Sequence, residues 1–380
     1  MAVTGAPTES YELGPIRPPS EAYSLLIRVT RNCPWNRCKF CPIYKGSKFQ
    51  LRTVDEVKQD IDVAKAIHDD IIELARKSGG GDIRRTAAMV SNGAATDAAR
   101  NVALWMYAGG KHAFLQDANT LIMKTPGLVE VIKYLKQTFP DIDRITSYAR
   151  SKTASQRTVE ELVELRKAGL SRIHMGVESG YDPVLEFMDK GVTAADHVKG
   201  GKNVVASGIS LCSYVMPGAG GKKMWREHAL ETAKVLNEIN PDFIRLRTLT
   251  IQPRMLLHED VVSGDFIRLN DEEIVGEIRL LIENLDCSAE IVSDHMMNLL
   301  PEVEGKLPQD KDKILSIIAR FQSLPPRERD NYKLGRRLGI YDKLDNLDDT
   351  YRRGEVEKVM TRIGKDTLDD VLYNLMERYV

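Results

Sequence analysis

The chain alternates between two kinds of segment, and this alternation limits the folds that it can adopt. Short runs rich in β-branched and aliphatic residues predict strands at 24–30, 112–115, 144–147, 172–177, 209–215 and 243–248. Between them, apolar residues at i, i+3 and i+4 predict helices over 54–77, 126–139, 159–167, 194–207 and 222–239. From the second strand onward the predicted strands start 32, 28, 37 and 34 residues apart, which matches a βαβ unit. We therefore predict an α/β fold with a parallel sheet or barrel.

Three regions depart from this alternation. Residues 79–110 form a Gly-rich and Ala-rich insertion that is predicted to contain one additional helix. Beyond residue 286, a short strand at 290–293 and helices over 311–324, 326–338 and 354–380 predict a mainly helical extension or cap. The first 22 residues contain four prolines and predict an extended segment. The expected parts are therefore 1–22, an α/β core over 23–286, and a helical part over 287–380.

Composition excludes several classes of protein. A chain of 380 residues with 42% hydrophobic residues is long and apolar enough for a buried core, which excludes a disordered protein. No apolar stretch approaches the roughly 20 residues of a membrane span, and the start lacks a signal peptide's apolar region. We therefore expect a soluble, cytoplasmic protein without a membrane partner. With 54 basic and 55 acidic residues, binding to nucleic acid is not favoured.

Three of the five cysteines, Cys33, Cys38 and Cys41, lie within nine residues. A disulfide framework is not expected from an odd number of cysteines in a long chain without a secretion signal, so this cluster predicts metal ligands. The cluster directly follows the first predicted strand, and α/β folds build their sites at the carboxyl ends of strands. Cys212 and Cys287 lie in apolar segments and are expected to be core residues.

The three thiols are an incomplete set of ligands for one kind of metal site. A structural zinc site needs four ligands, and the nearest histidines, His68 and His112, lie outside a compact zinc-finger spacing. An iron–sulfur cubane held by three cysteines leaves one iron open for an exogenous ligand. The cysteines therefore favour an iron–sulfur cluster with a function, and a zinc or other structural site is the alternative.

The segment from Arg28 to Tyr44 resembles the radical S-adenosylmethionine superfamily, in which three cysteines follow the first strand of a partial (βα)6 TIM-like barrel. The resemblance covers about 23–286. It is nearest to the subgroup of coproporphyrinogen dehydrogenase, the elongator-type enzymes and the methylthiotransferases. It implies a [4Fe-4S] cluster on Cys33, Cys38 and Cys41 that cleaves S-adenosylmethionine reductively, giving a 5′-deoxyadenosyl radical that abstracts hydrogen from a substrate. The chain departs from the usual C-x3-C-x2-C motif because its spacing is C-x4-C-x2-C.

The same resemblance implies cofactor contacts near the cysteines and at the ends of the second and third strands. Phe40, directly before the third cysteine, would lie against adenine. The turn after the second strand stands where the family often has Gly-Gly-Glu, and the third strand ends in polar groups suited to ribose or carboxylate. The residues concerned are Gln116, Asp117, Asn119, Ser147 and Arg150. A polar turn with an Asx cap is the alternative for the first of these segments.

Later strands supply further candidates by the same resemblance. Gly-Val-Glu-Ser-Gly at 176–180 resembles the subgroup's Gly-x-Glu-Ser-Gly, and Lys-Gly-Val-Thr at 190–193 resembles its Lys-Gly-x-Thr turn. The Gly-rich loop at 216–221 resembles the family's loop near adenine. The implied contacts are Glu178, Ser179, Lys190, Met216 and Gly218. The alternatives are a helix N-cap for Glu178, a solvated surface position for Lys190 and a simple turn for the Gly-rich loop.

The substrate is not readable from the sequence. His295 and Asn298, in a polar stretch between apolar segments, are candidate substrate contacts, although a lone histidine is more often a packing residue. A second cysteine cluster is absent from the sequence, which argues against the methylthiotransferases. The resemblance also implies a reductant such as flavodoxin or ferredoxin.

Two other classes remain open. The stretch Arg327 to Arg353 mixes arginines with tyrosines, as in a nucleic-acid modification or binding protein whose cluster is structural, but nearby acidic residues largely cancel its charge. A zinc-binding structural protein is the other alternative.

Overall fold

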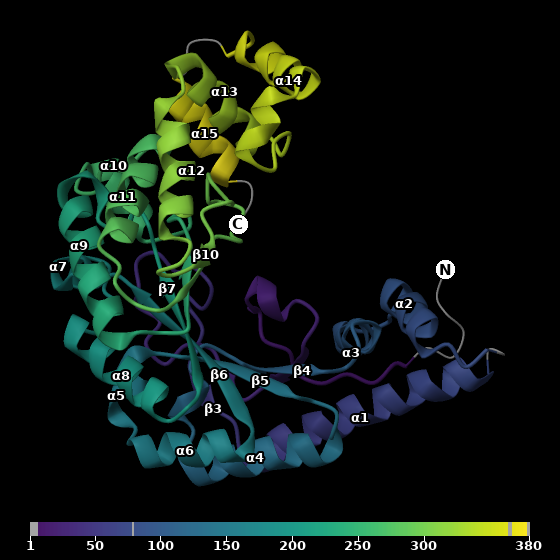
Figure 1. Cartoon of the computed structure of the whole chain (residues 1–380). Coiled ribbons are helices and arrows are strands. Elements are labelled where there is room, and N and C mark those ends of the chain that lie inside the picture. The colour runs from purple at the N-terminus through teal and green to yellow at the C-terminus, as the bar shows by residue number, and fades with distance from the viewer. Residues whose placement is uncertain (1–6, 78–79, 364–366, 378–380) are drawn as a thin grey trace. The chain divides into compact units, whose positions relative to one another are not determined.

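The computed structural model describes residues 7–77, 80–363 and 367–377. Residues cluster into two compact units. Unit 1 comprises Met1–Asn36, Ile43–Met175 and Asn203–Leu211, and unit 2 comprises Arg37–Pro42, Gly176–Lys202 and Cys212–Val380. None of the described helices is long and apolar enough to cross a membrane. Figure 1 labels the elements of both units.

Unit 1 is built on parallel strands in the order β1, β4, β5, β6. Their bounds are Leu25–Arg28, His112–Gln116, Arg144–Ala149 and Leu170–Glu178, the last three residues of β6 belonging to unit 2. The register pairs Leu26 with Phe114 and Phe114 with Thr146. The connecting helices are α1 (Val54–Lys77), α4 (Thr125–Thr138), α5 (Ser151–Gln156) and α6 (Val159–Ala168). Buried residues of α1 recur every three or four positions, for example Val57, Ile61 and Ala64, so they lie on one face of the helix and pack into the core.

The insertion in unit 1 contains two helices, so the additional helix that was predicted is present together with a second one that was not. Helix α2 spans Ile83–Gly93 and α3 spans Asp97–Tyr107, while residue 79 lies outside the described residues. Asp82 caps α2 by accepting a hydrogen bond from the Arg85 amide, and Thr96 caps α3 by accepting one from Ala99. The Thr96 cap marks the start of the second helix within this Ala-rich stretch.

The end of the first predicted strand forms a separate element. β1 ends at Arg28, and Thr30–Arg31 (β2) pairs antiparallel with Gln50–Leu51 (β3). In the chain, the cysteine segment therefore lies between the two strands of a short antiparallel ladder.

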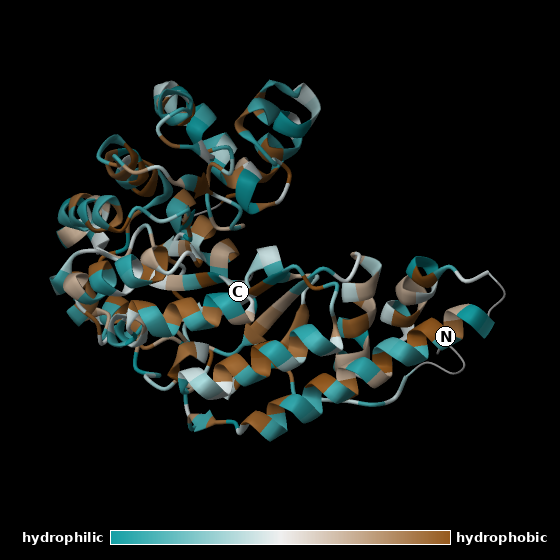
Figure 2. Cartoon of the chain, turned by 60° about the horizontal axis from the view of Figure 1, so that its bottom comes forward, coloured by the Kyte–Doolittle hydropathy of each residue, from teal (hydrophilic) through white to brown (hydrophobic). Residues whose placement is uncertain are grey.

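Unit 2 contains parallel strands β7, β8 and β9, with β10 antiparallel to β9. Their bounds are Ser210–Val215, Phe243–Leu246, Glu290–Val292 and Gly305–Lys306. The first helices are α7 (Asp182–Phe187), α8 (Ala194–Ala206), α9 (Gly221–Ile239), α10 (Leu257–Ser263) and α11 (Asp271–Glu283), although the last residues of α8 and the first two of β7 belong to unit 1. Figure 2 shows helices that carry both hydrophobic and hydrophilic residues along their length, as packing on one face requires.

The C-terminal part of unit 2 is helical, as predicted. It contains α12 (Lys311–Ser323), α13 (Pro326–Arg337), α14 (Thr350–Met360) and α15 (Leu368–Met376). The predicted helix 354–380 was wrong as one element, because Asp349 caps a helix that starts earlier and Thr367 caps a second one. Residues 364–366 and 378–380 of that prediction lie outside the described residues. Ile244, Phe321 and Tyr332 belong to one buried core.

Apart from the short antiparallel ladder of β2 and β3, one or more helices separate successive strands from β1 to β8, and these strands pair in parallel within each unit. The predicted α/β class, with the chain order of a partial (βα)6 barrel and a helical extension, is confirmed. The division at residues 22 and 286 stays a prediction.

Candidate functional site

Asparagines shape the part of the cysteine loop that belongs to unit 1. Asn32 and Asn36 have φ of 66° and 50°, a left-handed conformation that asparagine tolerates better than most residues. The Asn32 side chain donates to the Lys48 carbonyl at 2.7 Å, and the Asn36 amide donates to Cys33 Sγ at 3.5 Å. Asn36 is one of the four residues between the first two cysteines. The longer first spacing is thus accommodated by a left-handed turn whose amide faces the first thiol.

Asp117 anchors the base of this loop. Its Oδ2 accepts hydrogen bonds from the Arg28 guanidinium at 2.7 and 2.9 Å and from the Asn32 amide at 3.3 Å. Its Oδ1 accepts from the Tyr44 hydroxyl at 2.6 Å. Burial, and then the charge of Asp117, raise the pKa of Tyr44 above its ordinary value. Asp117 is fully buried, and both of its carboxylate oxygens accept hydrogen bonds from protein groups. Sequence reasoning assigned this residue to the cofactor and missed Tyr44.

The other unit 1 candidates also contact protein groups. The Gln116 carboxamide donates to the Ile16 carbonyl at 2.8 Å and accepts from the Gly14 amide at 2.9 Å, which fixes the N-terminal segment. Asn119 accepts from the Arg150 amide at 3.0 Å. The Arg150 guanidinium lies 5.0 Å from the centre of the Trp35 ring in the cysteine loop.

Ser147 is fully buried and donates a hydrogen bond to the Tyr148 carbonyl at 3.0 Å. Contact of the unit 1 candidates Gln116, Asp117, Asn119, Ser147 and Arg150 with a cofactor stays a prediction.

Unit 2 holds the turn that carries the other two cysteines. The Cys41 amide donates to the Cys38 carbonyl at 3.2 Å, so the two residues share one tight turn. Lys39, between them, donates its amide to the Met188 carbonyl at 3.0 Å and accepts from the Leu257 amide at 3.1 Å. These bonds fix the turn to the end of α7 and the start of α10.

The side chain of Lys39 strengthens the same attachment. Its ammonium group binds Asp260 at 3.0 Å and lies 4.4 Å from the centre of the Phe187 ring. The turn is therefore tied to helices by backbone bonds, an ion pair and an aromatic contact.

The donor set fits an iron–sulfur cluster by its chemistry. Cys33, Cys38 and Cys41 form no disulfide and are partly exposed, whereas Cys212 and Cys287 are buried, as predicted. Within the described ranges, the side chains include no group of three or more His, Cys, Asp and Glu placed to hold a metal ion. Three thiols in one short loop, two of them in a single turn, remain the natural donors for a cubane.

Three predicted cofactor contacts meet in unit 2. Lys190 Nζ lies 2.9 Å from Glu178 Oε1 and 5.5 Å from the centre of the Phe40 ring. Glu178 has φ of 62°, a conformation that costs about 1 kcal/mol for a residue with a side chain. A Cβ at Gly176 would lie 2.3 Å from Glu178 Oε1, so any side chain there would have to displace the end of Glu178. The Glu178 carboxylate, the Lys190 ammonium and the Phe40 ring form one largely buried group.

Met216 lies in a hydrophobic cluster beside this group. The cluster includes Met188, Ile251 and Leu257, and Phe40 packs against it. The Met216 amide donates to the Glu178 carbonyl at 3.0 Å, which ties the loop after β7 to the end of β6. Gly218 has φ of 91°, where a side chain would be strained. Ser179 is fully buried and its hydroxyl contacts His228 at 2.8 Å.

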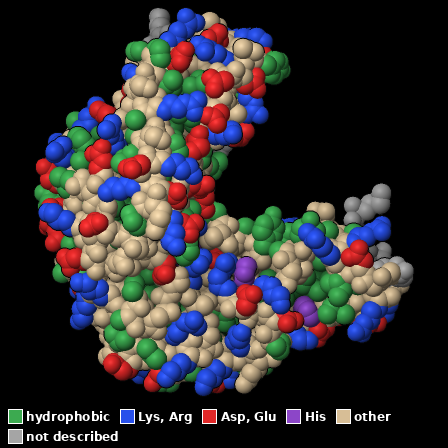
Figure 3. Space-filling model, in the orientation of Figure 1, with side chains coloured by type: hydrophobic (Ala, Val, Ile, Leu, Met, Phe, Trp, Pro, Cys, Tyr) green, Lys and Arg blue, Asp and Glu red, His purple; other side chains and the backbone are tan. Residues whose placement is uncertain are grey.

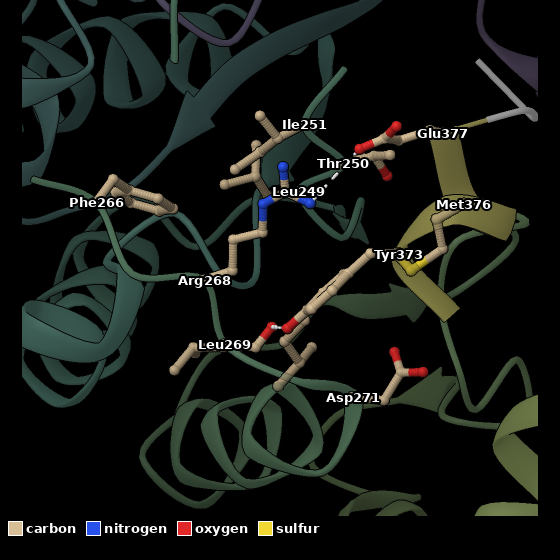
Figure 4. Close-up of a pocket in the computed structure, with 12 residues that line it drawn as sticks. Leu249, Thr250, Ile251, Phe266, Arg268, Leu269, Asp271, Tyr373, Met376 and Glu377 are labelled. Carbon is tan, nitrogen blue, oxygen red and sulfur yellow. Dashed lines mark hydrogen bonds and ion pairs between the residues drawn. The ribbon is translucent and has the colours of Figure 1, made fainter. Parts of the chain in front are cut away.

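A pocket of unit 2 adjoins Gly218 (Figure 4). It contains about 430 Å³ of space, part of it open to solvent, and its walls are mainly apolar. The Arg268 guanidinium lies 5.1 Å from the centre of the Tyr373 ring and 3.7 Å from Glu377. The walls come from the end of β8, α11 and α15, and this long-range assembly left no signal in the sequence. Such a pocket is able to take a small molecule with an apolar body.

The two candidate substrate residues differ in their surroundings. Asn298 is buried, donates to the Leu246 carbonyl at 2.9 Å and accepts from the Thr248 hydroxyl at 2.9 Å, so it secures the end of β8. His295 is partly buried, and burial, Arg247 and Arg337 lower its pKa to about 4. His295 is therefore neutral at pH 7.

The lowered pKa of His295 predicts that the stability of the protein depends on pH. Because its folded-state pKa of about 4 lies below the ordinary 6.5, the unfolded chain binds the proton more tightly between these values. His295 should therefore remove about 2 kcal/mol of the free energy of unfolding between pH 7 and pH 5. His295→Gln should lose less stability than wild type over this interval, as measured by urea denaturation. Parallel losses in both proteins would contradict the assignment.

The basic C-terminal stretch is engaged within unit 2. Ion pairs join Arg329 and Lys333 to Glu272, Arg337 to Asp271, and Arg353 to Glu328. Tyr332 and Tyr341 of the same stretch are fully buried. The visible face in Figure 3 intersperses basic and acidic side chains. The stretch therefore serves packing and leaves few charges for a phosphate backbone.

Comparisons with known proteins give partial similarities. No protein-family model matches the chain. An uncharacterized protein of Methanocaldococcus jannaschii is 26% identical over 113 residues, 30% of this chain and 34% of that protein. The tRNA uridine(34) acetyltransferase of the same organism is 25% identical over 117 residues, 30% of this chain and 22% of the enzyme. The matched region thus spans about a third or less of these relatives.

Solved structures are similar at low sequence identity. The archaeal Elp3 of Methanocaldococcus infernus has a TM-score of 0.44 and 14% identity, covering 79% of this chain and 64% of that one. The radical S-adenosylmethionine methyltransferase TsrM of Kitasatospora setae has a TM-score of 0.43 and 14% identity, covering 63% of this chain and 37% of that one. Coproporphyrinogen III oxidase of Escherichia coli, a radical SAM enzyme, has a TM-score of 0.39 and 16% identity, covering 64% of this chain and 52% of that one. All three similarities lie below a TM-score of 0.5 and below 25% identity.

Proposed function

We propose that this protein is a radical S-adenosylmethionine enzyme with a [4Fe-4S] cluster. The observation that carries the proposal is the loop of Cys33, Cys38 and Cys41, which follows β1 and the two-residue strand β2. When bound, the reduced cluster supplies an electron that cleaves S-adenosylmethionine to methionine and a 5′-deoxyadenosyl radical, which abstracts hydrogen from the substrate. The reductant would be flavodoxin or ferredoxin, and the site of action the cytoplasm.

The protein's own side chains would hold and orient the cofactor. Asn36 donates its amide toward Cys33 Sγ, and such a bond stabilises a thiolate ligand. Lys190 is suited to bind the carboxylate of S-adenosylmethionine, and Glu178 is suited to bind its ribose hydroxyls. Phe40, supported by the cluster around Met216, offers an apolar face to adenine. A fixed site of this kind orients the sulfonium before the reaction starts.

The test is reductive cleavage by the full-length protein. After anaerobic reconstitution with iron and sulfide, dithionite reduction and addition of S-adenosylmethionine, we expect 5′-deoxyadenosine by chromatography. A protein that forms a cubane and yields none of this nucleoside, even with cell extract as a source of substrate, would contradict the proposal. Stoichiometric zinc in place of iron would favour a structural zinc protein.

A second candidate is a nucleic-acid modification or binding protein with a structural iron–sulfur cluster. The observation that favours it is the 117-residue similarity to an enzyme whose name specifies tRNA as its substrate. Co-purification of RNA that is released steeply by salt would support this candidate, because phosphate contacts release counterions. The ion pairs of the C-terminal arginines make that stretch a poor RNA surface.

A further inference from the structure

Three buried side chains form a continuous polar chain inside unit 2. Ser179, His228 and Glu277 expose 0%, 1% and 2% of their surface. Ser179 Oγ lies 2.8 Å from His228 Nδ1, and Glu277 Oε1 lies 3.4 Å from His228 Nε2. The residues come from the end of β6, from α9 and from α11. Because all three side chains are polar and almost fully buried, each of them needs a partner within the protein.

The partners of His228 define its protonation. Nε2 faces the Met216 carbonyl at 3.2 Å as well as Glu277, and both of these groups are acceptors, so Nε2 carries a proton. Ser179 Oγ accepts from the Tyr181 amide at 3.0 Å. Its hydroxyl proton can then point to Nδ1, which is an acceptor in the neutral ring. A neutral imidazole protonated on Nε2 therefore satisfies all of these partners.

The order serine, histidine, carboxylate is also found in hydrolases, but this site cannot act as one. A nucleophilic serine must reach its substrate, whereas Ser179 is fully buried. Its hydroxyl also has a backbone partner on one side and the imidazole on the other. The arrangement is a connection between elements.

The connection joins two segments that the proposed function uses. Ser179 directly follows Glu178, whose carboxylate pairs with Lys190 at 2.9 Å. On the other side, His228 binds the Met216 carbonyl, and Glu277 Oε1 accepts from the Gly218 amide at 2.8 Å. His228 thus bridges the turn after β6 and the loop after β7, the two segments with which Phe40 forms a common group.

We propose that His228 is a positioning residue that sets the turn at Glu178 and the loop at 216–218 in the spacing required to bind S-adenosylmethionine. The proposal rests on the proposed function. It predicts that loss of His228 raises the KM for S-adenosylmethionine more than it lowers kcat, because binding contacts are shifted while the cysteines are untouched.

Variants of His228 can remove its contact with Ser179 and its contact with Met216 separately. His228→Asn places a polar group near the position of Nδ1 and keeps the link to Ser179, and His228→Gln reaches toward Nε2 and keeps the link to Met216. We expect each of these variants to weaken S-adenosylmethionine binding about 10-fold and His228→Ala to weaken it about 100-fold, since a lost hydrogen bond corresponds to about one factor of 10. Iron content should not change.

The matched control is Tyr341→Phe, which removes one buried hydrogen bond, to Asn331 at 2.6 Å, from the same unit. Each reconstituted variant is analysed for iron, for S-adenosylmethionine affinity by anaerobic calorimetry and for its urea midpoint. The control should lose stability and keep its affinity. Equal affinity of His228→Ala and wild type, or an equal loss in Tyr341→Phe, would overturn the proposal.

Failure of the two proposals can be told apart. A wild-type protein that holds no cubane or does not bind S-adenosylmethionine refutes the proposed function itself. A wild-type protein that binds it, with His228 variants that bind equally well, refutes only the positioning role. If His228→Ala does not fold, the Asn and Gln variants still decide the question, because each retains one half of the bridge.

Discussion

Cys33→Ala, Cys38→Ala and Cys41→Ala should each abolish formation of 5′-deoxyadenosine. A cubane with one open iron needs three protein thiolates, so a chain with only two of these thiolates should lose the cluster altogether. The loss should exceed about 100-fold, because even partners outside the ligand set change metal affinity by 10-fold to 100-fold. The measurements are iron per chain, the cubane's absorption and paramagnetic signals, and the nucleoside produced.

Cys287→Ala is the matched control for these variants. Cys287 is buried at 5% exposure, far along the chain from the loop, so its replacement affects packing and leaves the three thiols in place. It should keep its iron and its activity. A Cys38→Ala protein with full iron and activity would show that the cluster assignment is wrong.

Asp117→Ala should lower the free energy of unfolding by about 3 kcal/mol, because one partner of a buried ion pair is removed. Arg28 would keep Glu12, at 2.7 Å, but would lose its only other carboxylate partner within the described residues. The buried Tyr44 hydroxyl would lose its acceptor as well. Urea denaturation of the protein without its cluster measures this effect apart from iron binding.

Two controls define the size of the Asp117 effect. Glu130→Ala breaks the exposed pair with Lys58 and should cost less than about 1 kcal/mol. Asp117→Asn keeps an acceptor for Tyr44 and should fall between the two alanine variants. A loss for Asp117→Ala no larger than that for Glu130→Ala would show that the anchor is not needed for folding.

Local patterns in the sequence were sufficient for the main parallel strands and for the long helices between them. The bounds of α1 agree with the predicted 54–77 because its apolar residues repeat every three or four positions over many turns. The cysteine loop was located by residue type and spacing alone. The break between α2 and α3 was missed because it depends on one cap, Thr96, within a stretch that otherwise favours helix.

Contacts between distant residues could not be predicted in the same way. The roles of Asp117 and Tyr44 follow from a bond between residues 73 positions apart, and the pocket beside Gly218 needs α15. His228 and Glu277 occupy ordinary helical positions and have no motif. Phe40, Glu178 and Lys190 lie close together, and the acidic and amide side chains after β4 bind protein groups. Contact of both sets with the cofactor stays a prediction.

The missing side chain at Gly176 has a consequence for how this sequence can diverge. A methyl group there would lie 2.3 Å from Glu178 Oε1 and 3.0 Å from Lys190 Nζ, so the ends of these two side chains would have to move to admit it. Alanine at 176 would therefore displace the ion pair without removing either charge. We expect natural relatives that keep the acid at 178 and the lysine at 190 to favour glycine at 176.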